Sequence, residues 1–314
     1  MNILMLAPDY RLRSAWGCEL FRDEIGRQCD SVVRYYGTED NLHVPDILEK
    51  HPDVDLVLMM QLQFGRHYTG IRDVELPTVC WVEDYFPRHH DIKNQWLRWH
   101  EFDLVFLTQQ YFLPVFDEFQ VNGVIPGNTE RAWLPFSVDT KTYFETPFKE
   151  KETDVVALFN AHAFEYPNRA AVVDELNDML GVKVLAKLAN RPSDGVYHRS
   201  YVRALENAKI GVASLDQHGS CNQRHYEIPA CGTLLLTDGP PRDFPALQFR
   251  EGEHYVLYDG ISDLHDKVRY YLEHDDERLT IAQNGHTLVT GRHSNTNRAR
   301  DMFKIIAECF NGRT

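Results

Sequence analysis

Charged side chains stand directly before an apolar run in residues 220–238, SCNQRHYEIPACGTLLLTD. A helix that begins near Tyr226 and stops at Gly232 would keep the proline of this segment in its first turn, where proline is tolerated. Glu227 then lies in the first helical turn, and Arg224 lies in the loop before it. A carboxylate can accept two hydrogen bonds from a ribose diol, and a guanidinium can neutralise a diphosphate. Nucleotide binding is therefore one interpretation of this segment.

A structural role is the alternative for the same residues. Arg224 and Glu227 can form an internal ion pair that ties the loop to the helix start, where the helix dipole favours a carboxylate in any case. Composition alone leaves both interpretations open.

Other residues with suitable chemistry are spread along the chain. Asn160 ends an apolar strand and Arg169 opens the next helix, which predicts an anion site made of free backbone N–H groups and a guanidinium. Lys187 could offset diphosphate charge, Tyr197 could stack on a base, and Gly17 could let the backbone approach a ligand. The alternatives are a surface arginine, a solvated lysine, a packed loop tyrosine and an ordinary helix start.

The elements that must position these residues follow from the hydrophobic pattern. Near-continuous apolar runs such as NILMLA, VDLVLMM and FDLVFLT alternate with segments of helical spacing. Strands that are apolar on both faces predict parallel sheets covered on both sides, which is the doubly wound α/β class. The proline- and threonine-rich stretch after residue 134 lacks such a pattern and predicts a connection. We expect domains at 1–140 and 153–295, with ligands at the carboxyl ends of the strands and a final helix at 296–314.

Composition bounds the possible functions. The chain has 314 residues, 33 basic against 47 acidic, and a net charge of −14, which disfavours binding to nucleic acid or anionic lipid by bulk attraction. No apolar run approaches the roughly 20 residues of a membrane span. Six cysteines without CxxC spacing fit reduced thiols and a cytoplasmic location. No Asp-x-Asp follows a strand and no Gly-x-Ser-x-Gly is present, so neither a metal site nor a serine hydrolase is predicted.

The C-terminal half resembles a known family. It is similar to GT-B glycosyltransferases of the CgeB-like (spore-maturation-protein-like) group in an Asn-x-Arg-x-aromatic-Glu segment, an Ala-Cys-Gly turn, a Gly-Glu stretch and a His-Ser-x-x-x-Arg ending. The resemblance covers roughly residues 77–310. The matching residues are Asn222, Arg224, Tyr226, Glu227, Gly252, Glu253, Gly285, His293, Ser294 and Arg298.

This resemblance implies a GT-B fold, two Rossmann-like domains facing a cleft, and transfer of a sugar from a nucleotide-diphosphate sugar, UDP-linked by preference. It implies that Glu227 binds the donor ribose, that Arg224 and Asn222 face the phosphates or the sugar, and that Tyr226 belongs to the same donor-binding segment. Relatives with a Glu-x7-Glu motif carry a first glutamate where this chain has Gly219, so sugar and stereochemistry do not carry over. A metal ion is not expected, because arginines and helix N-termini can stabilise the leaving diphosphate.

The segment CWVEDYFPRHH supplies candidates for a general base. Glu83 and Asp84 end an apolar strand, and Arg88, His89 and His90 follow. In a GT-B protein this edge faces the donor, so Asp84, or otherwise Glu83 or His90, can take the proton of an acceptor hydroxyl. The alternative is a charge pair in a solvated turn.

Two rival functions remain open. A phage-type DNA glycosyltransferase acting on hydroxymethylated bases shares the fold, and the acidic charge counts against it. A basic cleft of Arg11, Arg13, Arg66, Arg88 and Arg98 would favour it. The second rival is a non-catalytic binding or structural protein that kept the fold. The resemblance further implies that the last helix, with Phe303 and Phe310, packs back on the first domain.

Overall fold

The computed structural model describes residues 1–7, 16–36, 42–60, 68–83, 85, 90–146, 151–161, 166–189, 195–216 and 218–310, without the side chains of 16 and 17. The backbone forms two compact units. The first contains Cys18–Pro135, the first strand and the segment from Thr296 onward, and the second contains Phe136–Asn295. None of the described helices is long and apolar enough to cross a membrane.

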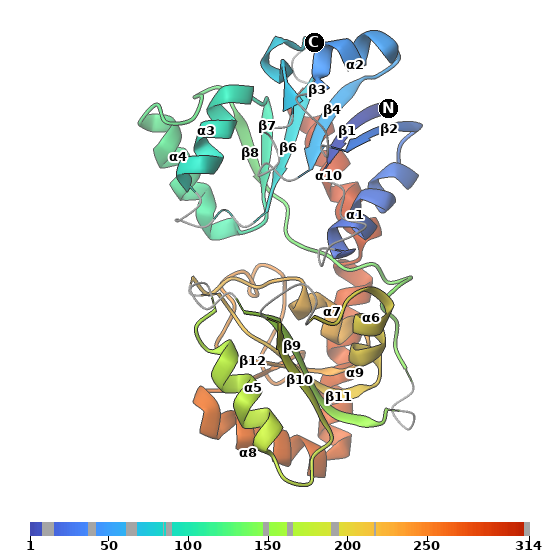
Figure 1. Cartoon of the computed structure of the whole chain (residues 1–314), viewed down its shortest axis with the longest axis vertical. Helices are drawn as coiled ribbons and strands as arrows, with labels where there is room; N and C mark the ends of the chain where they lie inside the picture. The colour runs from blue at the N-terminus through green and yellow to red at the C-terminus, as the bar shows by residue number, and fades with distance from the viewer. Residues whose placement is uncertain are drawn as a thin grey trace. The chain divides into compact units, whose positions relative to one another are not determined.

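A six-stranded parallel sheet forms the core of the first unit (Figure 1). Its order is β2-β1-β4-β6-β7-β8, and the two-stranded pair β3–β5 accompanies it. The strands are β1 (Asn2–Ala7), β2 (Ser31–Tyr36), β3 (Leu42–His43), β4 (Leu56–Met60), β5 (Tyr68–Thr69), β6 (Thr78–Val82), β7 (Leu104–Leu107) and β8 (Glu130–Trp133). The helices are α1 (Trp16–Arg27), α2 (Val44–Lys50), α3 (His90–His100), α4 (Leu113–Val121) and α10 (Asn295–Phe310).

The second unit has a five-stranded parallel sheet of order β10-β9-β11-β12-β13. In Figure 1, α5 and α8 lie on one side of this sheet and α6, α7 and α9 on the other. The strands are β9 (Thr153–Asn160), β10 (Val184–Ala189), β11 (Ala208–Ala213), β12 (Leu234–Thr237) and β13 (Val256–Leu257). The helices are α5 (Arg169–Asp178), α6 (His198–Glu206), α7 (Arg224–Ala230), α8 (Gly260–Glu273) and α9 (Asp275–Arg292).

Burial explains why these strands pair in parallel. Every residue of β4, β6, β7 and β12 is buried, as expected for sheets covered by helices on both faces. The predicted α/β class with parallel sheets is therefore confirmed.

Helix α7 begins earlier than the sequence predicts. Asn222 Oδ1 accepts a hydrogen bond from the backbone N–H of Arg224 at 3.1 Å, which starts the first turn there and not near Tyr226. Pro229 consequently lies in the last turn and not in the first, so this part of the prediction is wrong. The stop is as expected, because Gly232 takes the left-handed conformation with φ +62°.

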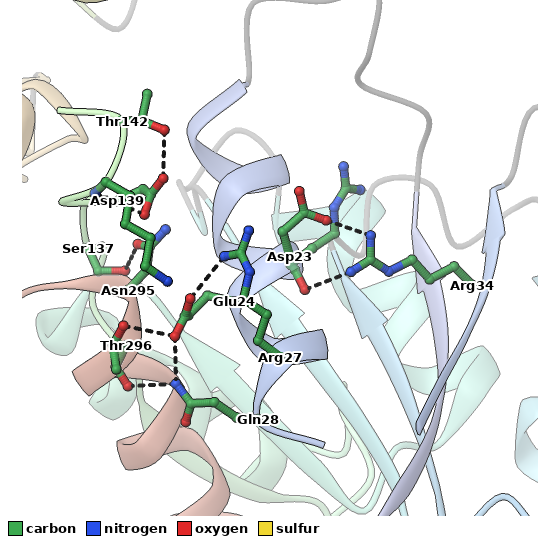
Figure 2. A network of polar contacts seen from close by, with 12 residues as sticks. Asp23, Glu24, Arg27, Gln28, Arg34, Ser137, Asp139, Thr142, Asn295 and Thr296 are labelled. Atoms are coloured by element: carbon green, nitrogen blue, oxygen red, sulfur yellow. Dashed lines mark hydrogen bonds and ion pairs between the residues drawn. The ribbon is translucent and has the colours of Figure 1, made fainter. Parts of the chain in front are cut away.

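The chain segments that enter and leave the second unit are hydrogen-bonded to each other. Val138 N–H donates to the carbonyl of His293 at 3.1 Å, and Asn295 N–H donates to the carbonyl of Val138 at 2.8 Å. Ser137 Oγ also donates to Asn295 Oδ1 at 2.7 Å, as Figure 2 shows. One residue further on, Thr296 Oγ1 donates to Glu24 Oε1 at 2.8 Å, which attaches the start of α10 to α1.

A buried lysine ties the connection to the second sheet. Lys151 is 5% exposed, and its Nζ donates to the carbonyls of Glu206 and Cys231 and to Thr233 Oγ1 at 2.8–3.0 Å. We expect Lys151→Ala to lower the free energy of unfolding by about 3 kcal/mol, since three buried acceptors lose their donor. Exposed Lys187 in β10 is the matched control, and Lys187→Ala should change stability by less than about 0.5 kcal/mol.

The effect of Lys151→Ala on the free energy of unfolding should depend on pH. Burial lowers the pKa of Lys151 from 10.5 to about 8. Between these values the unfolded chain holds the proton and the folded one does not, so this group makes the wild type more stable as pH rises. The difference in free energy of unfolding between the wild type and Lys151→Ala should be roughly 1–2 kcal/mol larger at pH 9.5 than at pH 7, as measured by urea titration. A difference that becomes smaller at pH 9.5 would contradict the lowered pKa of Lys151.

Candidate functional site

The candidate site lies at the carboxyl edge of the second sheet. Parallel strands bring their carboxyl ends to one edge, where ligands of such folds bind. Here β9 ends at Asn160, and α5 begins shortly afterwards with Arg169. The loop after β11 leads into α7, which begins with Arg224, and β12 is followed by Asp238. The topology thus collects polar residues that are far apart in the sequence.

Two arginines lie over one aromatic ring at this edge. The guanidinium carbons of Arg169 and Arg224 are 5.1 and 5.5 Å from the ring centroid of Phe159. Arg169 Nη1 donates to the carbonyl of Asn160 at 2.9 Å, and its guanidinium stacks 3.3 Å from the Tyr166 ring centroid. Arg224 Nε donates to the backbone carbonyl at the residue before Phe159, at 2.7 Å.

These two cations form no ion pair within the described part of the chain, although the charge of Asp238 acts on Arg169 and that of Glu227 on Arg224. Arg169 is 3% exposed, and burial together with the nearby charge of Arg224 lowers its pKa to about 9. The Nε of Arg169 is buried without a hydrogen-bond partner among the described residues. Neither arginine forms an ion pair with a described carboxylate, so two neighbouring positive charges can receive an anion with several acceptor oxygens.

Glu227 is held by two tyrosines from other segments. It is 5% exposed, and its Oε1 accepts from the Tyr143 hydroxyl at 2.9 Å and its Oε2 from the Tyr201 hydroxyl at 2.7 Å. Burial raises the pKa of Glu227, and the Tyr201 hydroxyl, the charge of Arg224 and the Tyr143 hydroxyl each lower it in part. Arg224 and Glu227 do not form an ion pair with each other, so the hypothesis of an internal Arg–Glu pair is wrong.

Two other residues of the motif serve the protein itself. Both polar atoms of the Asn222 side chain hold the loop: Nδ2 donates to the carbonyl of Ser214 at 3.0 Å, and Oδ1 caps α7. Tyr226 is 0% exposed, and its ring packs edge-on against Phe249 and His293 at 6.1 and 5.8 Å between centroids. The structure therefore places Tyr226 in the core and not at a ligand surface, because its ring faces inward from α7.

The other residues predicted to bind the nucleotide sugar lie on four different segments. Lys187 is exposed on β10, beside β9 in the register. Tyr197 precedes α6, and its ring lies over Gly195, where an added Cβ would come within 2.2 Å of it. Asn160 contributes its backbone carbonyl to Arg169, and Gly17 lies in the first turn of α1.

The candidates for a general base are placed only in part. Asp84 lies outside the described residues, as do Arg88 and His89. Glu83 is buried after β6, and its Oε1 accepts from Cys18 Sγ at 2.8 Å. His90 is also buried, with Nε2 3.1 Å from the carbonyl of Tyr85 and its ring among aromatic side chains. Glu83 and His90 thus each have a hydrogen-bond partner within the first unit, and their role as a base stays a prediction.

Sequence reasoning missed three residues of the site. Tyr143 comes from the connection and Tyr201 from the surface of α6, and neither position carries a local signal. Asp238 accepts from the backbone N–H of Leu215 at 2.6 Å and from Ser214 Oγ at 3.0 Å, which fixes the loop after β11. Its place directly after the apolar strand LLLT could have identified it.

The described side chains can also be compared with the ligand sets of metal sites. Within those ranges, no group of three or more His, Cys, Asp and Glu could hold a metal ion. The expectation of metal-independent chemistry stays a prediction.

The chain is similar to known proteins in two respects: part of its sequence matches a family model, and its fold matches solved structures. A family model described as glycosyl transferase-like matches residues 169–304, which include both arginines and Glu227. HepE from Anabaena in complex with UDP-glucose is similar in structure, with a TM-score of 0.71 at 12% identity over 98% of this chain and 100% of that one. Sucrose-phosphate synthase from Thermosynechococcus elongatus follows, with a TM-score of 0.64 at 10% identity over 99% and 100%.

A third similar structure is T4 phage BGT in complex with UDP and Mn²⁺, with a TM-score of 0.62 at 12% identity over 97% of this chain and 99% of that one. No curated protein sequence matches the chain. At these identities the structural likeness concerns the fold, and the family model adds the domain that carries the site. The chain thus has the α/β fold of the GT-B glycosyltransferases, and its residues 169–304 match the glycosyl transferase-like family model.

Proposed function

We propose that the protein transfers a sugar from a UDP-sugar to an acceptor hydroxyl without a metal ion. The observation that carries this proposal is the pair Arg169 and Arg224, two adjacent cations at the carboxyl edge of a parallel sheet that form no ion pair with a described carboxylate. A diphosphate supplies the negative charge and the acceptor oxygens that such a pair lacks. The same cations stabilise the charge that develops on the leaving diphosphate, which is the task of a metal ion in other transferases.

Glu227 supports a nucleoside attached to that diphosphate. Each of its carboxylate oxygens accepts one tyrosine hydroxyl and retains capacity for a second donor, such as a ribose hydroxyl. UDP is the nucleotide we favour, because HepE and the T4 phage protein are both bound to UDP in their structures. We also propose membership of the CgeB-like group and a cytoplasmic location.

The acceptor side of the proposal depends on Asp84. Glu83 and His90 already have hydrogen-bond partners, Cys18 and the carbonyl of Tyr85, and Asp84 is the residue of that segment that we propose as general base. Asp84→Asn should abolish turnover and leave UDP affinity unchanged, because an amide cannot take the proton and the donor site lies in the other unit.

Calorimetric titration with UDP, GDP, ADP and TDP tests the donor assignment. We expect a micromolar dissociation constant for UDP, weaker binding of the others, and no change on addition of EDTA. Release of UDP from a panel of UDP-sugars then tests catalysis. Folded protein that binds none of the nucleotides would contradict the proposal, and UDP binding without turnover on any acceptor would favour a non-catalytic protein. DNA binding that weakens steeply with salt would favour the DNA-modifying rival.

A further inference from the structure

We infer that Tyr143 and Tyr201 are positioning residues that hold the Glu227 carboxylate as the ribose acceptor and thereby set the pH range in which the nucleotide binds. This inference rests on the proposed function, and it goes beyond it by assigning two residues and a measurable property. Neither tyrosine belongs to the motif that carries the resemblance, and Tyr143 lies outside the domain matched by the family model.

The geometry gives each carboxylate oxygen its own tyrosine. The Tyr143 hydroxyl lies 2.9 Å from Oε1 of Glu227, and the Tyr201 hydroxyl lies 2.7 Å from Oε2. A carboxylate oxygen accepts about two hydrogen bonds, so one lone pair on each oxygen remains for a diol. Two fixed donors from different segments restrict rotation of the carboxylate, and they point both remaining lone pairs in a defined direction.

The two tyrosines also oppose the effect of burial on Glu227. Burial disfavours the charged form and raises the pKa of Glu227, and the two hydroxyls stabilise the charged form. Two further charged or titratable groups act on this cluster: Arg224 acts on Glu227 and Tyr201, and Cys231 acts on both tyrosines. Lys151 and Glu206 act in turn on Cys231. Of these, Arg224 also favours the ionised carboxylate. A neutral Glu227 would have one oxygen carrying a proton and could no longer accept both ribose hydroxyls.

Tyr143 is held rigidly by the segment that enters the second unit. The backbone N–H groups of Thr142 and Tyr143 both donate to the carbonyl of Asp139, and Thr142 Oγ1 donates to Asp139 Oδ2 at 2.6 Å (Figure 2). The residue before Asp139, Val138, is hydrogen-bonded to the segment between α9 and α10. A tight turn on an anchored segment therefore delivers this hydroxyl, which suits a donor that must not move.

The test is the affinity for UDP as a function of pH in Tyr143→Phe and Tyr201→Phe. Affinity should fall as pH drops through the pKa of Glu227, because the protonated carboxyl loses an acceptor. Loss of one hydroxyl donor to a carboxylate raises that pKa, so the midpoint of the fall should move upward by about one to two pH units in each variant. Titration of the terminal phosphate of UDP affects the wild type and the variants equally. The difference between their midpoints therefore reports the protonation of Glu227.

Tyr258→Phe is the matched control. Tyr258 is buried in the same unit, and its hydroxyl has no hydrogen-bond partner among the described residues, so its removal should leave the midpoint unchanged. Thermal unfolding of each variant separates a loss of fold from a shift of midpoint. If both variants fold and their midpoints are unchanged, the inference about the tyrosines is wrong, and the proposed function is unaffected. A wild type that binds no nucleotide at any pH would overturn the proposed function and this inference with it.

Discussion

Glu227→Ala is expected to weaken UDP binding by at least roughly 100-fold, because two charge-assisted hydrogen bonds to the ribose are lost. Glu227 is the only acidic side chain of α7, and it is buried between Tyr143 and Tyr201. Calorimetric titration at pH 7.5 measures the change, and 2′,3′-dideoxy-UDP supplies a ligand that lacks both hydroxyls. Wild type should bind this analogue as weakly as the variant binds UDP.

Loss of the carboxylate also leaves two buried hydroxyls without their acceptor, so the fold must be checked. Glu227→Gln keeps the shape and one acceptor oxygen, and it should lose most of the UDP affinity with a smaller loss of stability. Glu227→Ala should bind UDP and the dideoxy analogue equally, and Glu227→Gln should keep only a small preference for UDP through its amide oxygen. If Glu227→Gln binds UDP as the wild type does in a folded state, the ribose assignment is wrong.

Arg169→Met and Arg224→Met are each expected to weaken UDP binding by about 10- to 100-fold and to leave uridine binding unchanged. Methionine removes the charge and keeps an apolar chain against Phe159 and Tyr166. The affinities of the two variants for UDP and uridine, measured side by side, separate phosphate contacts from contacts to the nucleoside. The double variant should bind UDP little better than uridine.

Arg203→Ala is the matched control. It removes an exposed arginine of α6 in the same unit and should change neither the UDP affinity nor the uridine affinity. Equal losses for UDP and uridine would show that the arginines maintain the fold and do not bind phosphate.

The local pattern predicts the elements well, and the reasons are visible in single strands. Runs such as LVLMM and TVCWV are buried along their whole length, and continuous apolar strands leave a covered parallel sheet as the solution. The predicted start of α7 is two residues too late, because the side chain of Asn222 accepts from the backbone N–H of Arg224, a local signal that the sequence already contains. Pro229 is tolerated at the far end because the helix is only seven residues long.

The site residues also divide into those that a local sequence pattern predicts and those that only tertiary contacts bring together. The sequence by itself determined the α/β class and the position of Arg169 at a helix start, because these depend on local periodicity and spacing. It also offered Arg224 and Glu227 as candidate ligands, which stays a prediction. Only the tertiary structure decided which side chains meet: Arg169 and Arg224 over Phe159, and Glu227 between two tyrosines separated by 58 positions in the chain. Such contacts depend on strand order and on the path of a connection without periodicity, and no local pattern of residues encodes them.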